Sequence, residues 1–378
     1  GATLPQGIVY GDISDLLLVA LVLSGLGIVN IYSAGSFSLN ESPAPFFLKQ
    51  LYWLSISLIV LIASVAIDYQ LIARNCYLLH GAVVLLLIAA FFLGGPTAGT
   101  HRWIQIGSFS FQPSEFAKVS LVIFLASSFS GSTPSTAGFL QGLVLPGLLT
   151  AATFLLVFLQ PDLGTAGLLL IVFISFLFLV RLDLKQIAAV VVSGLALLPC
   201  SLFFMEEYQK KRIITFLNPD KDSLRAGYQA IQSKIAIGSG MLSGKGFMSG
   251  TQSQLRFLPE QHTDFAFSVW AEEWGFIGSV LLLLLFFMVI SKGLKIASLA
   301  RDRLGSLLAV GLAGCAGMEK ESRQRQVASM LAYLFPGDPE SLAKARDYFE
   351  EAYRMEPLLR AANGWAKKMD QELEALED

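Results

Sequence analysis

Charged residues are scarce in this sequence. Asp, Glu, Lys and Arg make up 15% of its 378 residues, and 54% are hydrophobic. Soluble domains carry about 25% charged residues, so this composition excludes an ordinary soluble domain and indicates an integral membrane protein. The net charge of −2 leaves no basic surplus, and we expect no nucleic-acid partner.

Cysteine is also rare. The three cysteines, Cys76, Cys200 and Cys315, lie far apart in or beside apolar runs. An odd, dispersed set does not suit a disulfide framework or a metal site, and we interpret these residues as small buried apolar side chains. The first apolar run lacks a basic segment before it and a cleavage signature after it, so it is a retained span rather than a signal peptide.

Long apolar runs, by contrast, are abundant. About 20 such residues cross a bilayer as a helix, because only an internally hydrogen-bonded backbone is stable there. The sequence therefore predicts an all-α polytopic membrane protein, a bundle of transmembrane helices. The predicted spans lie near 14–33, 48–67, 77–94, 115–130, 139–159, 163–180, 186–204 and 266–290.

Lys and Arg set the predicted orientation. Short loops after even-numbered spans carry Arg74, Arg181, Lys185, Lys292, Lys295, Arg301 and Arg303, and those after odd-numbered spans carry only Lys49 and Arg102. Because cytoplasmic loops are rich in Lys and Arg, the N-terminus is expected in the cytoplasm. The loops 95–114 and 205–265 are then extracytoplasmic.

The end of the chain has a different character. Residues 305–317 read as a ninth apolar segment that is too short to cross a bilayer. From Met318 onward charge is dense and long apolar runs are absent. We interpret 318–378 as a small, soluble, charged helical appendage of separate origin, such as a fused segment.

The first outer loop leads into a helix that carries charge. Pro113 suits the first turn of a helix, and Glu115 and Lys118 follow on one face, three residues apart. Charges at this depth are expected to pair. The pair either ties the helix into the bundle or forms a charged floor for an anionic head group. Further along, Asp162 follows Pro161, which predicts a helix cap.

The long outer loop holds most of the candidate chemistry. Residues 225–237 have a helical pattern, and five glycines follow between 238 and 250. Lys245 and Arg256 lie among backbone N–H groups that suit a phosphate, although the spacing is not that of a nucleotide-binding loop. Glu260 and His262 come next, and we count both, together with Lys245, Arg256 and Glu272, among the candidate substrate-binding residues.

Asp264 ends this loop. If 263–290 is one helix, Asp264, Ser268 and Glu272 form a polar stripe that must face a protein interior or a water-filled cavity. Asp264 alone is explained equally well as a helix cap. The polar residues before it and Glu272 after it favour a functional carboxylate.

Several stretches resemble a known family: QPSEFAK, QPDLGT, AGYQAIQSKIAIGSG, GKGFMSGTQSQLRFLPEQHTDF and AEEWGFIG. From about 12 to 313 the chain is similar to the SEDS proteins (shape, elongation, division and sporulation) of bacteria, and GTQSQL favours the elongation branch. The resemblance implies ten spans, of which about eight are readable here. Residues 305–378 do not match the family's last two spans.

The resemblance also implies an activity and a partner. SEDS proteins polymerise lipid II into peptidoglycan at the outer face of the cytoplasmic membrane, together with a class B penicillin-binding protein. The family's essential Asp falls on Asp264, its paired Glu and Lys on Glu115 and Lys118, and its Arg-Trp pair on Arg102 and Trp103.

Two roles stay open for Asp264. It suits a general base for the acceptor sugar hydroxyl, and it equally suits a ligand for Mg²⁺ or Mn²⁺ that bridges the pyrophosphate. No organic cofactor is expected. The rival functions are a flippase for the lipid-linked precursor and an inactive scaffold for a penicillin-binding protein.

Overall fold

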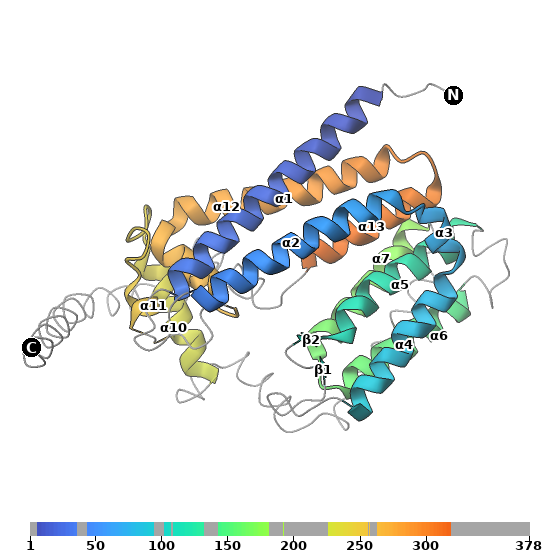
Figure 1. The fold of residues 1–378 in the computed structure, drawn as a ribbon, viewed down its shortest axis with the longest axis horizontal. Helices are drawn as coiled ribbons and strands as arrows, with labels where there is room; N and C mark the ends of the chain where they lie inside the picture. The colour runs from blue at the N-terminus through green and yellow to red at the C-terminus, as the bar shows by residue number, and fades with distance from the viewer. Residues whose placement is uncertain are drawn as a thin grey trace, which may run out of the picture. The chain divides into compact units, whose positions relative to one another are not determined.

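The computed structural model of the protein describes residues 6–35, 44–93, 102–106, 109–131, 143–180, 192, 226–255, 257 and 263–318. These residues are mostly helical (Figure 1). The helices are α1 (Gln6–Gly35), α2 (Ala44–Ala66), α3 (Tyr69–Arg74), α4 (Cys76–Leu93), α5 (Pro113–Ser130), α6 (Leu145–Leu159), α7 (Leu163–Leu179), α10 (Ala226–Ser239), α11 (Thr251–Gln254), α12 (Ala266–Ser298) and α13 (Arg303–Met318). A short antiparallel hairpin joins β1 (Ile104–Ile106) to β2 (Phe109–Phe111).

The helices follow the predicted apolar runs. Seven of the eight predicted spans coincide with a described helix, and the seventh, 186–204, lies outside the described residues apart from Val192. The charged segment after Met318 also lies outside them. Three described helices are long and apolar enough to cross a membrane, at Gly11–Gly35, Phe46–Ala66 and Ala266–Ser298. The other apolar helices are shorter.

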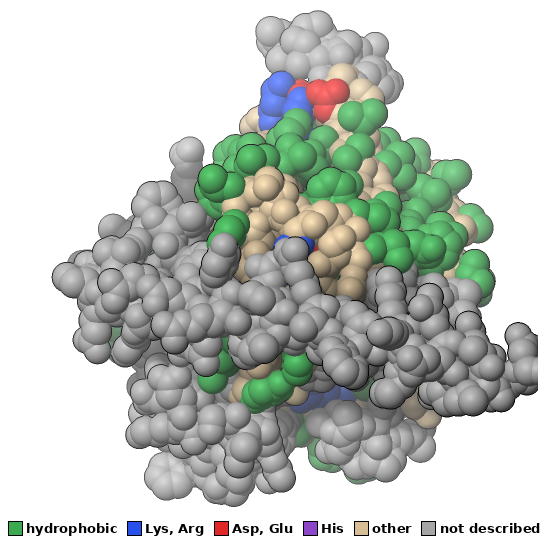
Figure 2. Space-filling view, turned by 90° about the vertical axis from the view of Figure 1, so that its left-hand side faces the viewer, with side chains coloured by type: hydrophobic (Ala, Val, Ile, Leu, Met, Phe, Trp, Pro, Cys, Tyr) green, Lys and Arg blue, Asp and Glu red, His purple; other side chains and the backbone are tan. Residues whose placement is uncertain are grey.

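Apolar side chains also cover much of the described surface. Figure 2 shows them over one face, with a small group of charged side chains at one end. The α2 span has none of its residues buried inside the protein. A bilayer accepts such a surface, whereas a soluble protein rarely exposes apolar patches of this extent.

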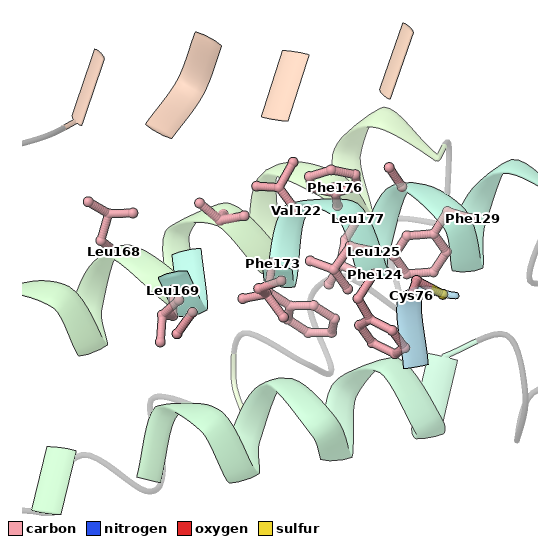
Figure 3. Close-up of a cluster of buried hydrophobic side chains, with 14 of the residues drawn as sticks. Cys76, Val122, Phe124, Leu125, Phe129, Leu168, Leu169, Phe173, Phe176 and Leu177 are labelled. Carbon is pink, nitrogen blue, oxygen red and sulfur yellow. The ribbon is translucent and has the colours of Figure 1, made fainter. Parts of the chain in front are cut away.

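The chain forms two compact units, and the first contains residues 1–20, 57–211 and 286–320. In this unit α5 packs against α4, α6, α7 and α13. Phe124, Leu125 and Phe176 are fully or almost fully buried in the resulting core (Figure 3). Between membrane helices such packing stabilises by close van der Waals contact, because lipid tails are as apolar as the side chains.

Buried polar side chains join helices within this unit. His80 of α4 lies 3.1 Å from the Ser120 hydroxyl of α5 and 3.0 Å from the Thr153 hydroxyl of α6. Asp12 of α1 pairs with Lys292 and Lys295 of α12, at 2.9 and 2.8 Å. Each group thereby satisfies hydrogen-bonding capacity that would be costly to leave unpaired.

The second unit contains residues 21–56, 212–285 and 321–378. Its described part holds α10, α11 and the first half of α12, and α10 packs against α11. The Asn30 side chain of α1 donates to the Ala266 carbonyl at 2.7 Å, and the hydroxyls of Ser233 and Ser268 lie 2.7 Å apart. The start of α12 is therefore held from two other helices.

Candidate active site

The helix that follows Asp264 is broken. Gly275, inside α12, has φ 64° and ψ −160°, a conformation that other residues rarely adopt. The start of α12 at Ala266 agrees with the predicted span 266–290, but the condition of one continuous helix over 263–290 is not met, because the helix is interrupted at Gly275. A single glycine in an apolar run does not announce such a break.

The glycine-rich loop, residues 240–254, supplies hydrogen-bond partners for the backbone groups at this break. Carbonyls before Gly275 and amides after it lose their helical partners, and the loop supplies new ones. The four hydrogen bonds are Lys245 N–H to Glu272 O (2.9 Å), Gly246 N–H to Glu273 O (3.0 Å), Phe276 N–H to Met241 O (2.8 Å) and Ile277 N–H to Leu242 O (3.1 Å). Loop and helix therefore form one structural unit at this point.

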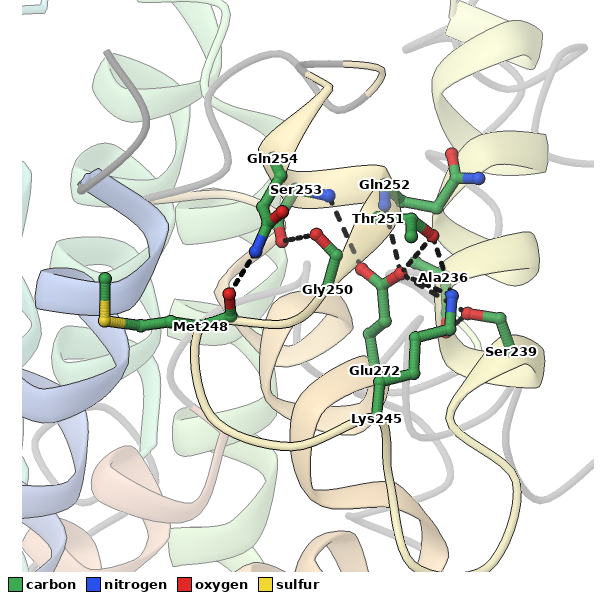
Figure 4. A network of polar contacts seen from close by, with 10 residues as sticks. All are labelled: Ala236, Ser239, Lys245, Met248, Gly250, Thr251, Gln252, Ser253, Gln254 and Glu272. Atoms are coloured by element: carbon green, nitrogen blue, oxygen red, sulfur yellow. Dashed lines mark hydrogen bonds and ion pairs between the residues drawn. The ribbon is translucent and has the colours of Figure 1, made fainter. Parts of the chain in front are cut away.

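Glu272 is the centre of a buried polar network (Figure 4). Its side chain is 0% exposed, and its Oε1 lies 2.9 Å from Lys245 Nζ. The same oxygen accepts from the Thr251 hydroxyl at 3.1 Å and from the Gln252 N–H at 3.0 Å. Its Oε2 accepts from the Ser253 N–H at 3.4 Å. The prediction that Ser268 and Glu272 face a protein interior is confirmed, since both are fully buried.

Gly250 is required in the loop because the backbone approaches Glu272 closely at this position. A Cβ added to Gly250 would lie 2.7 Å from Glu272 Oε2. The loop backbone can therefore reach the carboxylate only without a side chain at this position.

The amides expected to cradle a phosphate are already paired. The N–H groups of Lys245 and Gly246 donate to carbonyls of α12, and those of Gln252 and Ser253 donate to Glu272. The positive charge of Lys245 is likewise balanced by Glu272. Binding of substrate by Lys245 stays a prediction.

Asp264 lies in a turn directly before α12, and its side chain is exposed. The amides of Ser268 and Val269 both donate to the Phe265 carbonyl, so the first helical turn closes one residue after Asp264. The carboxylate is thus presented at the end of a long apolar helix. Its catalytic role stays a prediction at this stage.

A second cluster of predicted residues lies in the other unit. Arg102 donates to the carbonyls of Gln160, at 2.7 Å, and Pro161, and its guanidinium lies 3.9 Å from Asp162. Asp162 in turn accepts from the Thr165 N–H at 3.3 Å, which confirms the predicted cap of α7. Trp103, half-buried, follows Arg102 just before β1.

Glu115 and Lys118 form the predicted ion pair. Lys118 Nζ lies 2.8 Å from Glu115 Oε2, and α5 begins at Pro113 as expected. The lysine side chain is 9% exposed and the glutamate 47%. The pair therefore presents its carboxylate to the surroundings and keeps its cation inside.

Three predicted site residues, Arg256, Glu260 and His262, lie outside the described residues. Thr251, Gln252 and Ser253 were not predicted as partners of Glu272. The only signal for them was a polar TQSQ run after Gly250, which has no pattern that names a partner.

The described residues offer a limited donor set for a metal. They contain no group of three or more His, Cys, Asp or Glu placed to hold an ion. Mg²⁺ often binds through one or two carboxylates together with substrate phosphates and water, and the exposed Asp264 fits that mode.

Comparison with known proteins places these observations in a family. The chain matches the family of cell cycle proteins named for FtsW, RodA and SpoVE over residues 14–316. It is 37% identical over 303 residues to the peptidoglycan glycosyltransferase MrdB of Escherichia coli K12, covering 79% of each chain.

Two solved structures are similar as well. A peptidoglycan synthase complex contains a chain that is 32% identical, with TM-score 0.64 and coverage of 79% of this chain and 82% of that one. RodA of Thermus thermophilus is 26% identical, with TM-score 0.58 and coverage of 85% and 84%. The predicted fold class and family resemblance are thus confirmed, and the chain belongs to the FtsW/RodA/SpoVE family of bacterial membrane proteins.

Proposed function

We propose that this protein is a peptidoglycan glycosyltransferase that polymerises lipid II into glycan strands during cell-wall elongation. The observation that carries this function is the 37% identity to a peptidoglycan glycosyltransferase over 79% of both chains. The proposed site is at the outer face of the bacterial cytoplasmic membrane, with the N-terminus in the cytoplasm, as the Lys and Arg distribution favours.

In the proposed reaction, Asp264 acts as general base. It takes the proton from the 4-hydroxyl of the acceptor sugar as that oxygen attacks the anomeric carbon of the donor. The new glycosidic bond forms while the bond to the pyrophosphate oxygen breaks, and undecaprenyl pyrophosphate leaves with the electron pair. An exposed carboxylate at the start of an apolar helix suits a substrate whose sugars are in water and whose tail is in lipid.

A divalent cation fits the same site. Mg²⁺ or Mn²⁺ bound by Asp264 would neutralise the pyrophosphate that leaves. The protein's own cations are proposed to assist, with Lys118 oriented by Glu115 and Arg102 held by Asp162. Trp103, Lys245, Arg256, Glu260 and His262 complete the proposed substrate-binding set. Glu272 is left out of it because its side chain is fully buried.

The proposed partner is a class B penicillin-binding protein. Support comes from the resemblance to the elongation branch of the family and from the similarity to a chain of a peptidoglycan synthase complex. Such a partner would crosslink the strands that this protein makes.

The test is polymerisation of labelled lipid II by the purified protein, with Asp264→Asn as the variant and wild-type chain as the reference. General acid–base catalysis contributes about 10²–10⁴-fold, and we expect a loss of that size. Thermal melting of the variant in the same detergent checks that it is folded. Normal polymerisation by a folded Asp264→Asn protein would refute the assignment.

The flippase alternative is separated by a second assay. Proteoliposomes with fluorescent lipid II in one leaflet distinguish chain formation from translocation. Translocation without polymer would replace the glycosyltransferase proposal.

A further inference from the structure

We propose that Glu272 is a positioning residue, which acts by fixing the glycine-rich loop, residues 240–254, to the break in α12. This inference rests on the proposed function, because Asp264, the proposed catalytic residue, directly precedes the helix that carries Glu272. Glu272 itself is fully buried and contacts no solvent, so it acts through the loop rather than on the substrate.

The first support is the number of groups that converge on one carboxylate. Glu272 accepts from Lys245, from the Thr251 hydroxyl and from two backbone amides of α11. Lys245 also donates to the Thr251 hydroxyl at 2.7 Å. A buried ion pair adds little net stability over an apolar pair of the same volume, so its best-attested use is to select one arrangement of the chain.

The second support is the path of the chain after the loop. The Phe257 N–H donates to the Gln252 carbonyl at 3.2 Å, so Phe257 is bonded directly to α11. Asp264 lies eight residues before Glu272, next to the start of the same helix. Thus α11 is bonded to α12 through Glu272, and Asp264 is continuous with the start of α12.

The neighbouring carboxylate provides a matched control. Glu273 is also buried, but its side chain accepts from the Ser33 hydroxyl of α1 and from the backbone of Met248, and the bonds to the amides of Gln252 and Ser253 are made by Glu272. The adjacent side chains of Glu272 and Glu273 therefore bond to different groups. Faster exchange at the amides of Gln252 and Ser253 should therefore follow replacement of Glu272 alone.

The direct experiment is hydrogen exchange on the full chain in detergent. In Glu272→Gln, the amides of Gln252 and Ser253 should exchange about tenfold faster, because their charged acceptor is lost. In Glu273→Gln they should exchange at the wild-type rate. Unchanged exchange in Glu272→Gln, or equal changes in both variants, would overturn the proposal.

Kinetics then separate positioning from simple stabilisation. We expect Glu272→Gln to lower kcat for lipid II polymerisation by about tenfold and to change KM by less than about twofold. The kcat is calculated from the concentration of folded protein. Wild-type kcat in the folded variant would show that the contact only stabilises the fold and would overturn the positioning role. If Glu272→Gln does not fold, the double variant Lys245→Met with Glu272→Gln replaces it, because that protein buries no unpaired charge.

The two proposals fail in distinguishable ways. If the wild-type protein makes no polymer, the proposed function fails. Exchange at Gln252 and Ser253 still decides whether Glu272 anchors the loop, because that readout needs no substrate.

Discussion

Replacing Lys245 with methionine should be among the most destabilising single changes to the loop. The substitution keeps most of the side-chain length and removes the ammonium group that lies 2.9 Å from Glu272. Glu272 is 0% exposed, so its charge would remain buried without a countercharge. Breaking a buried pair in this way costs about 3–5 kcal/mol.

We expect Lys245→Met to lower the free energy of unfolding by about 3 kcal/mol, at the lower end of this range, because four neutral donors remain on the carboxylate. Glu272→Gln should cost less, about 1–2 kcal/mol, because the partly exposed Lys245 can reach solvent. The double variant buries neither charge and should lie within about 1 kcal/mol of the wild type.

The assay is equilibrium unfolding of the four proteins in one detergent, compared as a double-mutant cycle. A wild-type stability for Lys245→Met would refute the buried ion pair. A double variant whose loss equals the sum of the two single losses would show that the residues do not interact.

Three further predictions concern other parts of the chain. Asp162→Ala removes the cap of α7 and the carboxylate beside Arg102, so unfolding should become easier by about 1–2 kcal/mol, measured by thermal melting in detergent; an unchanged melting temperature would contradict the capping role. Gly275→Ala places a side chain at φ 64° in contact with the loop and should lower the free energy of unfolding by at least about 1–2 kcal/mol in the same melting assay. The control is Gly25→Ala in α1, where an added Cβ meets nothing within 4 Å and the stability should not fall measurably. EDTA should abolish lipid II polymerisation and added Mg²⁺ should restore it, if Asp264 holds a cation as proposed; full activity in EDTA would leave only the base role.

Much of the fold was predictable because its signals are local. Apolar runs located the helices, Pro113 marked the start of α5, and Asp162 marked the start of α7. The Glu115–Lys118 pair followed from their spacing on one helix. Each of these features is decided by residues within one or two turns of each other.

The rest depends on contacts between distant segments. Glu272 and Lys245 are separated by 27 positions, and Asp12 and Lys292 by 280. The sequence shows these charges but not which one faces which. The break at Gly275 was not predicted for the same reason. A glycine in an apolar run interrupts a helix only where another segment bonds the backbone amides and carbonyls that lose their helical partners, and here that segment is the glycine-rich loop.

That break has a consequence for biogenesis. An interrupted helix cannot enter a bilayer with all of its backbone hydrogen bonds made within the helix, and each polar group left unpaired in hydrocarbon costs several kcal/mol. The residues that satisfy Phe276 and Ile277 precede them in the chain and are synthesised first. Insertion of α12 and docking of residues 241–246 should therefore occur together. A mutation that delays docking should lower the amount of protein in the membrane, because incompletely inserted chains are degraded.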